Sequence, residues 1–177
     1  MDILNTEFTA QIVAAAAGIE PKQVADWANK GLIVGQIGGG GVQGKVRRYS
    51  FFNLIEVACA VELMAAGVSS PRDAFQIARE YAHSGEAEVG WSGEPRNAPE
   101  RLPGLPYHHL KGTTYLLVSG SKSLIGAGNL DLLLKSIGSP RGFIGLDLTA
   151  IFVRTALAIG GSPWAMLDEA YAVGVAP

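Results

Sequence analysis

Gly18 and Pro21 lie three positions apart between two short segments of helical periodicity, and this spacing leaves room only for a tight turn. The first segment, AQIVAAAA, follows Thr9, whose side chain suits a helix N-cap, and it ends at Gly18. The second begins at Pro21, a residue preferred in the first turn of a helix, and it ends at Gly31. The sequence therefore predicts two short helices joined by a tight turn.

The second helix is predicted to be amphipathic. Val24, Trp27 and Ala28 fall at positions i, i+3 and i+4, so they form one apolar stripe. The remaining polar side chains are expected to face away from this stripe: Lys22, Gln23, Asp26, Asn29 and Lys30.

A glycine-rich segment follows, in which two β-prone arms, LIVGQI and VQGKVRRY, flank the run Gly38 to Gly41. We interpret it as a β-hairpin whose glycine tip can bend freely, rather than as a linker. A phosphate-binding loop would need a lysine-serine pair leading into a helix, and the run is instead followed by a β-prone arm. Three cations lie on the returning arm: Lys45, Arg47 and Arg48.

The charge distribution singles out the same region. The net charge of −2 gives no general attraction to nucleic acid. Between Pro21 and Tyr49, however, there are five cations and one anion. This is the one clearly basic region of the sequence.

Two more helices are predicted after the hairpin. Ser50 is a good N-cap for a helix from about Phe51 to Ala66, and Ser69 or Ser70 precedes Pro71 at the start of the next. The first of these helices has too few polar residues to cover a solvent face. A fuller local core would explain this, but we favour docking against the C-terminal part or a second subunit.

Helix, turn, helix, hairpin and two helices is the order of a winged helix-turn-helix, whose second helix enters the major groove while the wing contacts the backbone. The segments FTAQIVAAAAGIEPKQVADWANKGLI and RRYSFFNLIEVACAVELMAAGVSSPRDAFQIA resemble the DNA-binding domain of MerR-type regulators, over residues 8–82. The resemblance implies that Lys22 and Gln23 face the groove, that Arg47 and Arg48 are wing contacts, and that Tyr49 holds the wing to the core. The predicted DNA-binding residues are Lys22, Gln23, Asp26, Asn29, Lys30, Lys45, Arg47, Arg48 and Tyr49.

The sequence departs from the family pattern in two ways. Ala25 and Asp26 stand where the family usually carries an arginine and an aromatic residue, which removes a phosphate contact and adds a repelling charge. The long dimerisation helix of the classical activators is also excluded, because a proline-rich stretch follows the domain.

The predicted fold class is α+β, with a winged helix-turn-helix over residues 1–83, an extended connector over 84–112 and a small α/β unit over 113–177. The connector contains four prolines. In the last unit we expect strands at TTYLLVS and GFIGLDL, helices at NLDLLLKSI, TAIFVRTALAI and SPWAMLDEAYAV, and a surface loop at SGSKSLIGAG. Helix Thr149 to Ile159 is the predicted dimer contact through its apolar side chains: Ile151, Phe152, Val153, Leu157 and Ile159.

No catalytic or cofactor site is predicted. A single cysteine, Cys59, excludes an internal disulfide, and the three histidines lack the spacing of a zinc site. His108 and His109 are neighbours that would point in different directions in a regular structure, so we interpret them as loop residues. Asp147 has no partner acid or histidine. The N-terminus lacks a signal peptide and no apolar run reaches membrane-span length, so we expect a cytoplasmic protein.

The sequence thus favours a sequence-specific double-stranded DNA-binding protein, a transcriptional regulator that acts as a dimer. One alternative is a phage-type DNA recognition protein, such as an excisionase or a terminase small subunit. A second is a protein-interaction scaffold that has kept the fold and lost DNA binding, an idea motivated by Asp26 and the net negative charge.

Overall fold

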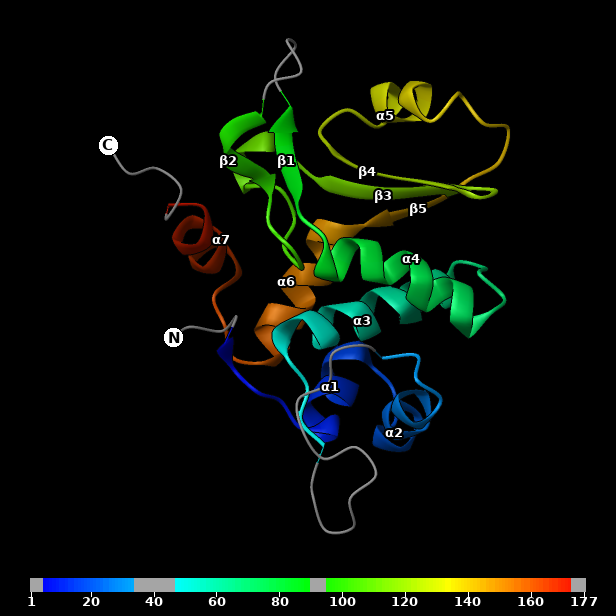
Figure 1. Cartoon of the computed structure of the whole chain (residues 1–177), viewed down its shortest axis with the longest axis vertical. Coiled ribbons are helices and arrows are strands. Elements are labelled where there is room, and N and C mark those ends of the chain that lie inside the picture. Colours follow the sequence, from blue (N-terminus) through cyan, green and yellow to red (C-terminus); the bar gives the residue numbers. More distant parts are fainter. Residues whose placement is uncertain (1–4, 34–46, 90–94, 173–177) are drawn as a thin grey trace.

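The computed structural model describes residues 5–33, 47–89 and 95–172, which form an α+β fold (Figure 1). Their elements, in chain order, are α1 (Ala10–Ala17), α2 (Pro21–Asn29), α3 (Phe51–Ala65), α4 (Pro71–His83), β1 (Glu86–Val89), β2 (Pro95–Arg101), the 3-10 turn η2 (His109–Lys111), β3 (Thr114–Ser119), β4 (Lys122–Ala127), α5 (Leu130–Ser136), β5 (Ile144–Asp147), α6 (Leu148–Ala158) and α7 (Pro163–Ala172).

The capping residues in the sequence predicted the starts of the N-terminal helices correctly. The Thr9 side chain accepts a hydrogen bond from the Ile12 N–H, as predicted for the N-cap of α1. Ser50 caps α3 in a reciprocal capping box with Asn53, and Ser70 caps α4. The predicted helix boundaries in this part of the chain are confirmed to within a few residues.

The three-stranded sheet has the order β4-β3-β5, and both strand pairings are antiparallel. Its Leu116, Val118 and Leu146 join the hydrophobic core with α3, α4 and α6, while α5 lies over the other face (Figure 1). The alternation of strands and helices suggested an α/β unit, but the pairing is that of an antiparallel sheet. The segment that we expected to be a surface loop, SGSKSLIGAG, contains strand β4.

Helix α3 docks against the C-terminal part, as predicted. The Phe51 ring meets Phe152 of α6 edge-on at a centroid distance of 6.5 Å, and Arg154 Nη2 donates to Glu62 Oε1 at 2.6 Å. Two polar residues of α3, Asn53 and Glu56, are themselves buried. The helix therefore has no need of a wide solvent face.

The prediction that α6 forms the dimer contact is wrong for its two central apolar residues. Ile151 and Phe152 are 5% and 0% exposed within a single chain, because they pack into the core beneath the sheet. Leu157 is exposed. Periodicity identified an apolar face on this helix, but the chain itself covers the part of that face formed by Ile151 and Phe152.

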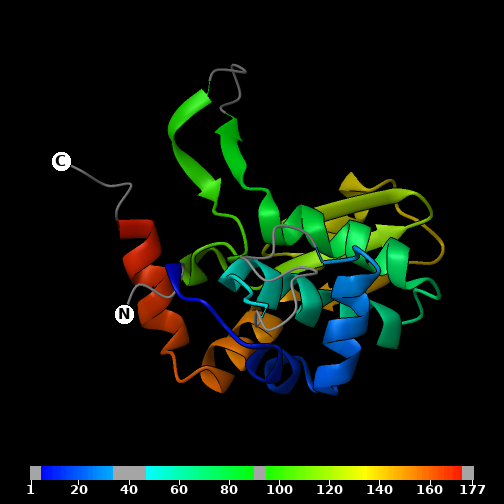
Figure 2. The same ribbon diagram turned by 60° about the horizontal axis from the view of Figure 1, so that its bottom comes forward.

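Residues 84–112, which we interpreted as an extended connector, contain two β-strands and a 3-10 turn. Strands β1 and β2 pair as an antiparallel ribbon that projects from the body (Figure 2). Arg101, the last residue of β2, is buried, and so are Leu105 and Tyr107 after it. The division of the chain into two units at this interval stays a prediction, although one hydrophobic cluster includes residues from both sides of it.

Among the residues that the structure describes, no single helix is both long and apolar enough to cross a membrane. Helices α6 and α7 meet these criteria only together, as a pair bent by 107°.

Burial of Cys59 predicts a loss of stability at alkaline pH. The thiol is fully buried in α3, and this burial raises its pKa from 9.0 to about 12. Between these values the thiol ionises in the unfolded chain and stays protonated in the folded one, so rising pH favours unfolding. We expect this group to lower the free energy of unfolding by about 1.4 kcal/mol per pH unit above pH 9.

Urea unfolding of the wild type and of Cys59→Ala, from pH 7 to pH 11, measures this effect. Tyr49 and Tyr81 also have raised pKa values, and their contribution is present in both proteins. The variant should lose stability less steeply above pH 9. Parallel curves would show that Cys59 makes no such contribution.

Candidate nucleic-acid interface

Helices α1 and α2 are joined by a tight turn, and their buried residues belong to the hydrophobic core. Gly18 adopts the left-handed conformation, with φ of 70°, and the Ile19 N–H bonds back to the Ala14 carbonyl. The apolar stripe of α2 faces inward as predicted, and the Trp27 ring meets Phe75 of α4 edge-on at 5.1 Å. This packing fixes the orientation of α2 relative to α4.

The polar side of α2 faces outward. All five side chains predicted to lie there are exposed: Lys22, Gln23, Asp26, Asn29 and Lys30. Lys22 and Gln23 lie in the first turn, where the Glu20 side chain makes no capping hydrogen bond. The backbone N–H groups of a first turn carry partial positive charge, so this end of α2 favours an anion such as a phosphate.

Tyr49 is the last residue of the predicted returning arm, of which the structure describes residues 47–49. Its N–H donates to the Phe8 carbonyl at 2.9 Å and its carbonyl accepts from the Phe8 N–H at 2.8 Å. The side chain is buried, and burial raises the pKa of its hydroxyl, although a hydrogen bond and the charge of Arg47 act in the opposite direction. Tyr49 therefore attaches the described end of the arm to the core, and Arg48 beside it is exposed.

A side-chain contact joins this arm to α2. Arg47 Nη1 donates to Asn29 Oδ1 at 3.2 Å across a separation of 18 residues. Arg47 is half-buried, which fits a residue shared between the two elements. This contact places the arm at Arg47 against the polar side of α2. We call the exposed polar side chains of α2, together with Arg47 and Arg48, the candidate surface.

One further cation adjoins this surface. Lys30 and Arg72 line the same groove of about 350 Å³ at the end of α2, together with Arg79. Arg79 is engaged by Glu56 and by the Leu32 carbonyl, whereas Arg72 is exposed in the first turn of α4. Sequence reasoning missed Arg72, since 42 positions separate it from Lys30 along the chain.

Most of the predicted hairpin lies outside the described residues, which stop at Ile33 and resume at Arg47. The part outside them includes Lys45 and the glycine run Gly38 to Gly41.

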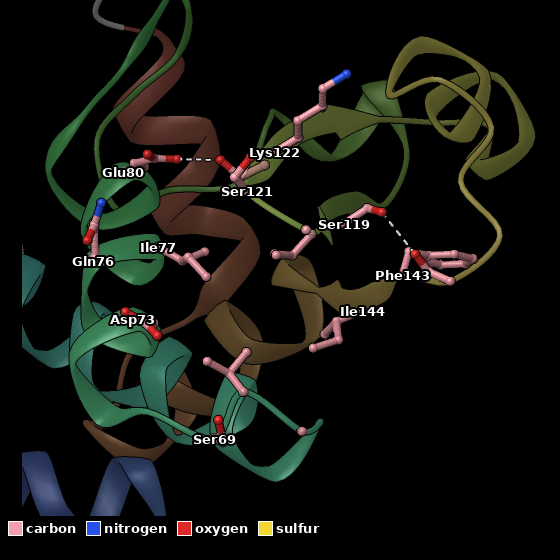
Figure 3. Close-up of a pocket in the computed structure, with 16 residues that line it drawn as sticks. Ser69, Asp73, Gln76, Ile77, Glu80, Ser119, Ser121, Lys122, Phe143 and Ile144 are labelled. Carbon is pink, nitrogen blue, oxygen red and sulfur yellow. Dashed lines mark hydrogen bonds between the residues drawn. The ribbon is translucent and has the colours of Figure 1, made fainter.

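A larger depression, of about 610 Å³, lies between α4 and the turn from β3 to β4 (Figure 3). The Ser123 hydroxyl donates to Glu80 Oε2 at 2.7 Å, and the Ser119 hydroxyl donates to the Gly142 carbonyl at 2.9 Å. Among the described residues that line it there is no histidine or cysteine. The serines therefore have no imidazole base beside them, and the depression offers no nucleophile of the serine-histidine type.

No protein-family model matches this chain, and no match is found among curated proteins. The likeness to MerR-type regulators accordingly rests on the residues quoted above.

Proposed function

We propose that this protein binds double-stranded DNA in a sequence-specific manner, with α2 in the major groove and the arm around Arg48 on the neighbouring backbone. The observation that carries the proposal is the exposed polar face of α2, joined to the arm by the bond between Arg47 and Asn29. Side chains near the start of such a helix reach base edges, while cations beside it contact phosphates.

The finer proposal is a transcriptional regulator that acts as a dimer. Since Ile151 and Phe152 are buried in their own chain, a dimer would not use these two side chains of α6. Palindromic half-sites in the bound DNA would reveal such a dimer. A phage-type recognition role uses the same interface and differs in the genes that surround it.

One observation favours the scaffold alternative. Asp26 is exposed on the same face of α2 as Lys22 and Gln23, where its carboxylate would repel phosphates. A scaffold would show no salt-sensitive affinity for duplex DNA. For a DNA-binding protein, the logarithm of the affinity decreases linearly with the logarithm of salt concentration.

Selection of bound sequences from random duplexes, with the full chain, tests the proposal directly. We expect one enriched motif, together with an affinity that decreases as salt increases. If no motif is enriched among the bound duplexes at any salt concentration, sequence-specific binding is refuted.

The variant Gln23→Ala is expected to relax base preference. A glutamine that pairs with adenine supplies about 1–3 kcal/mol of discrimination, so preference for the selected motif over random DNA should decrease about tenfold. Gln11→Ala, at an exposed glutamine of α1 that does not line the groove of Lys30 and Arg72, is the matched control and should keep the preference. An equal loss of affinity for both kinds of DNA in Gln23→Ala would exclude a base-reading role.

A further inference from the structure

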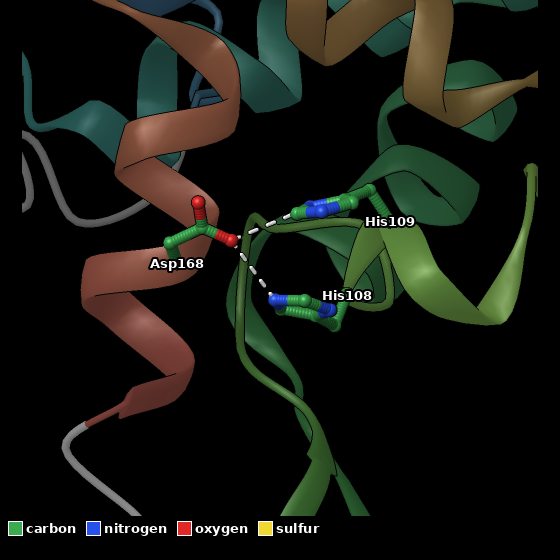
Figure 4. Close-up of side chains that lie close together, drawn as sticks. All are labelled: His108, His109 and Asp168. Atoms are coloured by element: carbon green, nitrogen blue, oxygen red, sulfur yellow. Dashed lines mark hydrogen bonds and ion pairs between the residues drawn. The ribbon is translucent and has the colours of Figure 1, made fainter.

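A second site is formed where α7 meets η2. Asp168 projects from α7 toward His108 and His109, which lie about 60 positions earlier in the chain (Figure 4). Its Oδ1 lies 3.1 Å from His108 Nε2 and 3.5 Å from His109 Nδ1. We expected the adjacent histidines to point in different directions, but the turn stacks their rings at a centroid distance of 4.2 Å.

These distances match the geometry of a transition-metal site. Zinc binds imidazole nitrogen and carboxylate oxygen at about 2.0–2.2 Å, so neighbouring ligand atoms at a tetrahedral ion are about 3.3–3.5 Å apart. Both measured distances to Asp168 are close to this value, and the ligand atoms of all three residues lie within 4.8 Å of one another. The two imidazole nitrogens would therefore need to approach each other by at most about 1.5 Å to bind the same ion.

The hydrogen bonds of the two rings leave one nitrogen of each ring able to bind an ion at the centre of the cluster. His109 Nδ1 is buried and has no hydrogen-bond partner among the described residues. The Leu110 N–H donates to His108 Nδ1 at 3.4 Å, so the neutral His108 ring carries its proton on Nε2, toward Asp168. An ion bound at Nε2 takes the place of that proton, which moves to Nδ1, and the long bond from Leu110 is lost.

Surrounding residues hold the three side chains in place. Tyr171, one turn after Asp168, donates its hydroxyl proton to the Pro106 carbonyl at 2.7 Å and accepts from the Leu102 N–H at 3.2 Å. Its ring meets His108 edge-on, and Trp164 meets His109 in the same way. Helix α7 is thereby anchored beside the histidines without any ion, which reduces the cost of ordering the ligands.

We propose that His108, His109 and Asp168 bind a divalent transition-metal ion of the zinc type, with water completing its coordination, and that the ion fastens α7 to the body of the protein. Two imidazoles and one carboxylate suit zinc, cobalt or nickel, whereas calcium and magnesium prefer ligand sets made only of oxygen. This inference is independent of the proposed DNA binding.

Titration of the full, tag-free chain with Zn²⁺ or Co²⁺ tests the site. We expect one ion per chain, intense visible absorption from Co²⁺ held in fewer than six ligands, and no competition from Mg²⁺. Asp168→Ala should weaken binding by about tenfold or more, because one of three protein ligands is lost. Glu169→Ala, the adjacent exposed acid of α7, is the matched control and should bind as the wild type does.

Hydrogen exchange measures the tether separately. Some backbone amides of α7 exchange their hydrogens through local opening of the helix. At an ion concentration about 100 times the dissociation constant, this exchange should slow by up to about 100-fold. Asp168→Ala should not respond. Equal affinities for Asp168→Ala and Glu169→Ala, or a Co²⁺ spectrum like that of the hydrated ion, would overturn the site. Ion binding without slower exchange in α7 would overturn the tether.

Discussion

Replacing Lys22 and Arg48 together by alanine is expected to weaken binding to duplex DNA about 60-fold near 0.1 M salt. Each neutralised phosphate contributes about 0.9 to the slope of log affinity against log salt concentration, so the slope should decrease by about 1.8. Both side chains are exposed, one on α2 and one on the returning arm. Fluorescence anisotropy at several salt concentrations measures the affinity and the slope together.

The matched control removes two cations elsewhere. Lys122 and Lys135 are exposed at the start of β4 and in the last turn of α5, and replacing both by alanine changes the net charge by the same amount. Equal effects of the two double variants would mean that the overall charge, rather than this surface, attracts DNA. Unchanged binding in Lys22→Ala/Arg48→Ala would remove both residues from the interface.

The parts of the fold that the sequence predicted well depend on local interactions. Thr9, Ser50 and Ser70 cap the helices that follow them because a capping side chain needs only the next turn of backbone. The inward face of α2 was also predicted, since Val24 and Trp27 define one stripe whatever they pack against.

The parts that sequence did not predict depend on distant partners. Strand β4 is an edge strand with exposed residues at its start, so it lacks the apolar run that marks a buried strand. Helix α6 has an apolar face, but periodicity cannot tell whether the same chain or a second copy covers it. The contact between Arg47 and Asn29 and the meeting of Asp168 with two histidines depend on how the chain folds back on itself.

Arg101 makes interactions that the composition of its segment did not predict. It stands in a stretch that we interpreted as a connector because of its prolines, yet it is 1% exposed. Its guanidinium donates to the carbonyls of Tyr81, Ser84, Leu102 and Leu105, at 2.6–3.5 Å, and lies 5.2 Å from the centre of the Tyr81 ring. The cation thus covers the C-terminal end of α4, where helix carbonyls lack partners within the helix.

We expect Arg101→Met to lower the free energy of unfolding by about 2–4 kcal/mol. A buried carbonyl that loses its donor costs about 1–3 kcal/mol. Tyr81 and Leu102 keep backbone partners, the N–H groups of Gly104 and Leu105, so the loss falls mainly on the carbonyls of Ser84 and Leu105. Urea unfolding at neutral pH, followed by circular dichroism, measures the change.

Arg101→Lys separates the charge from the geometry of the guanidinium. An ammonium keeps the charge at the end of α4 but reaches fewer carbonyls, so we expect a loss intermediate between wild type and Arg101→Met. A methionine of similar length removes the cost of burying a charge, and that saving opposes the loss of hydrogen bonds. Since the short bond to Ser84, at 2.6 Å, is charge-assisted, the hydrogen bonds should outweigh the saving. Equal stability of wild type and Arg101→Met would show that the two effects cancel and that apolar packing alone attaches this interval to α4.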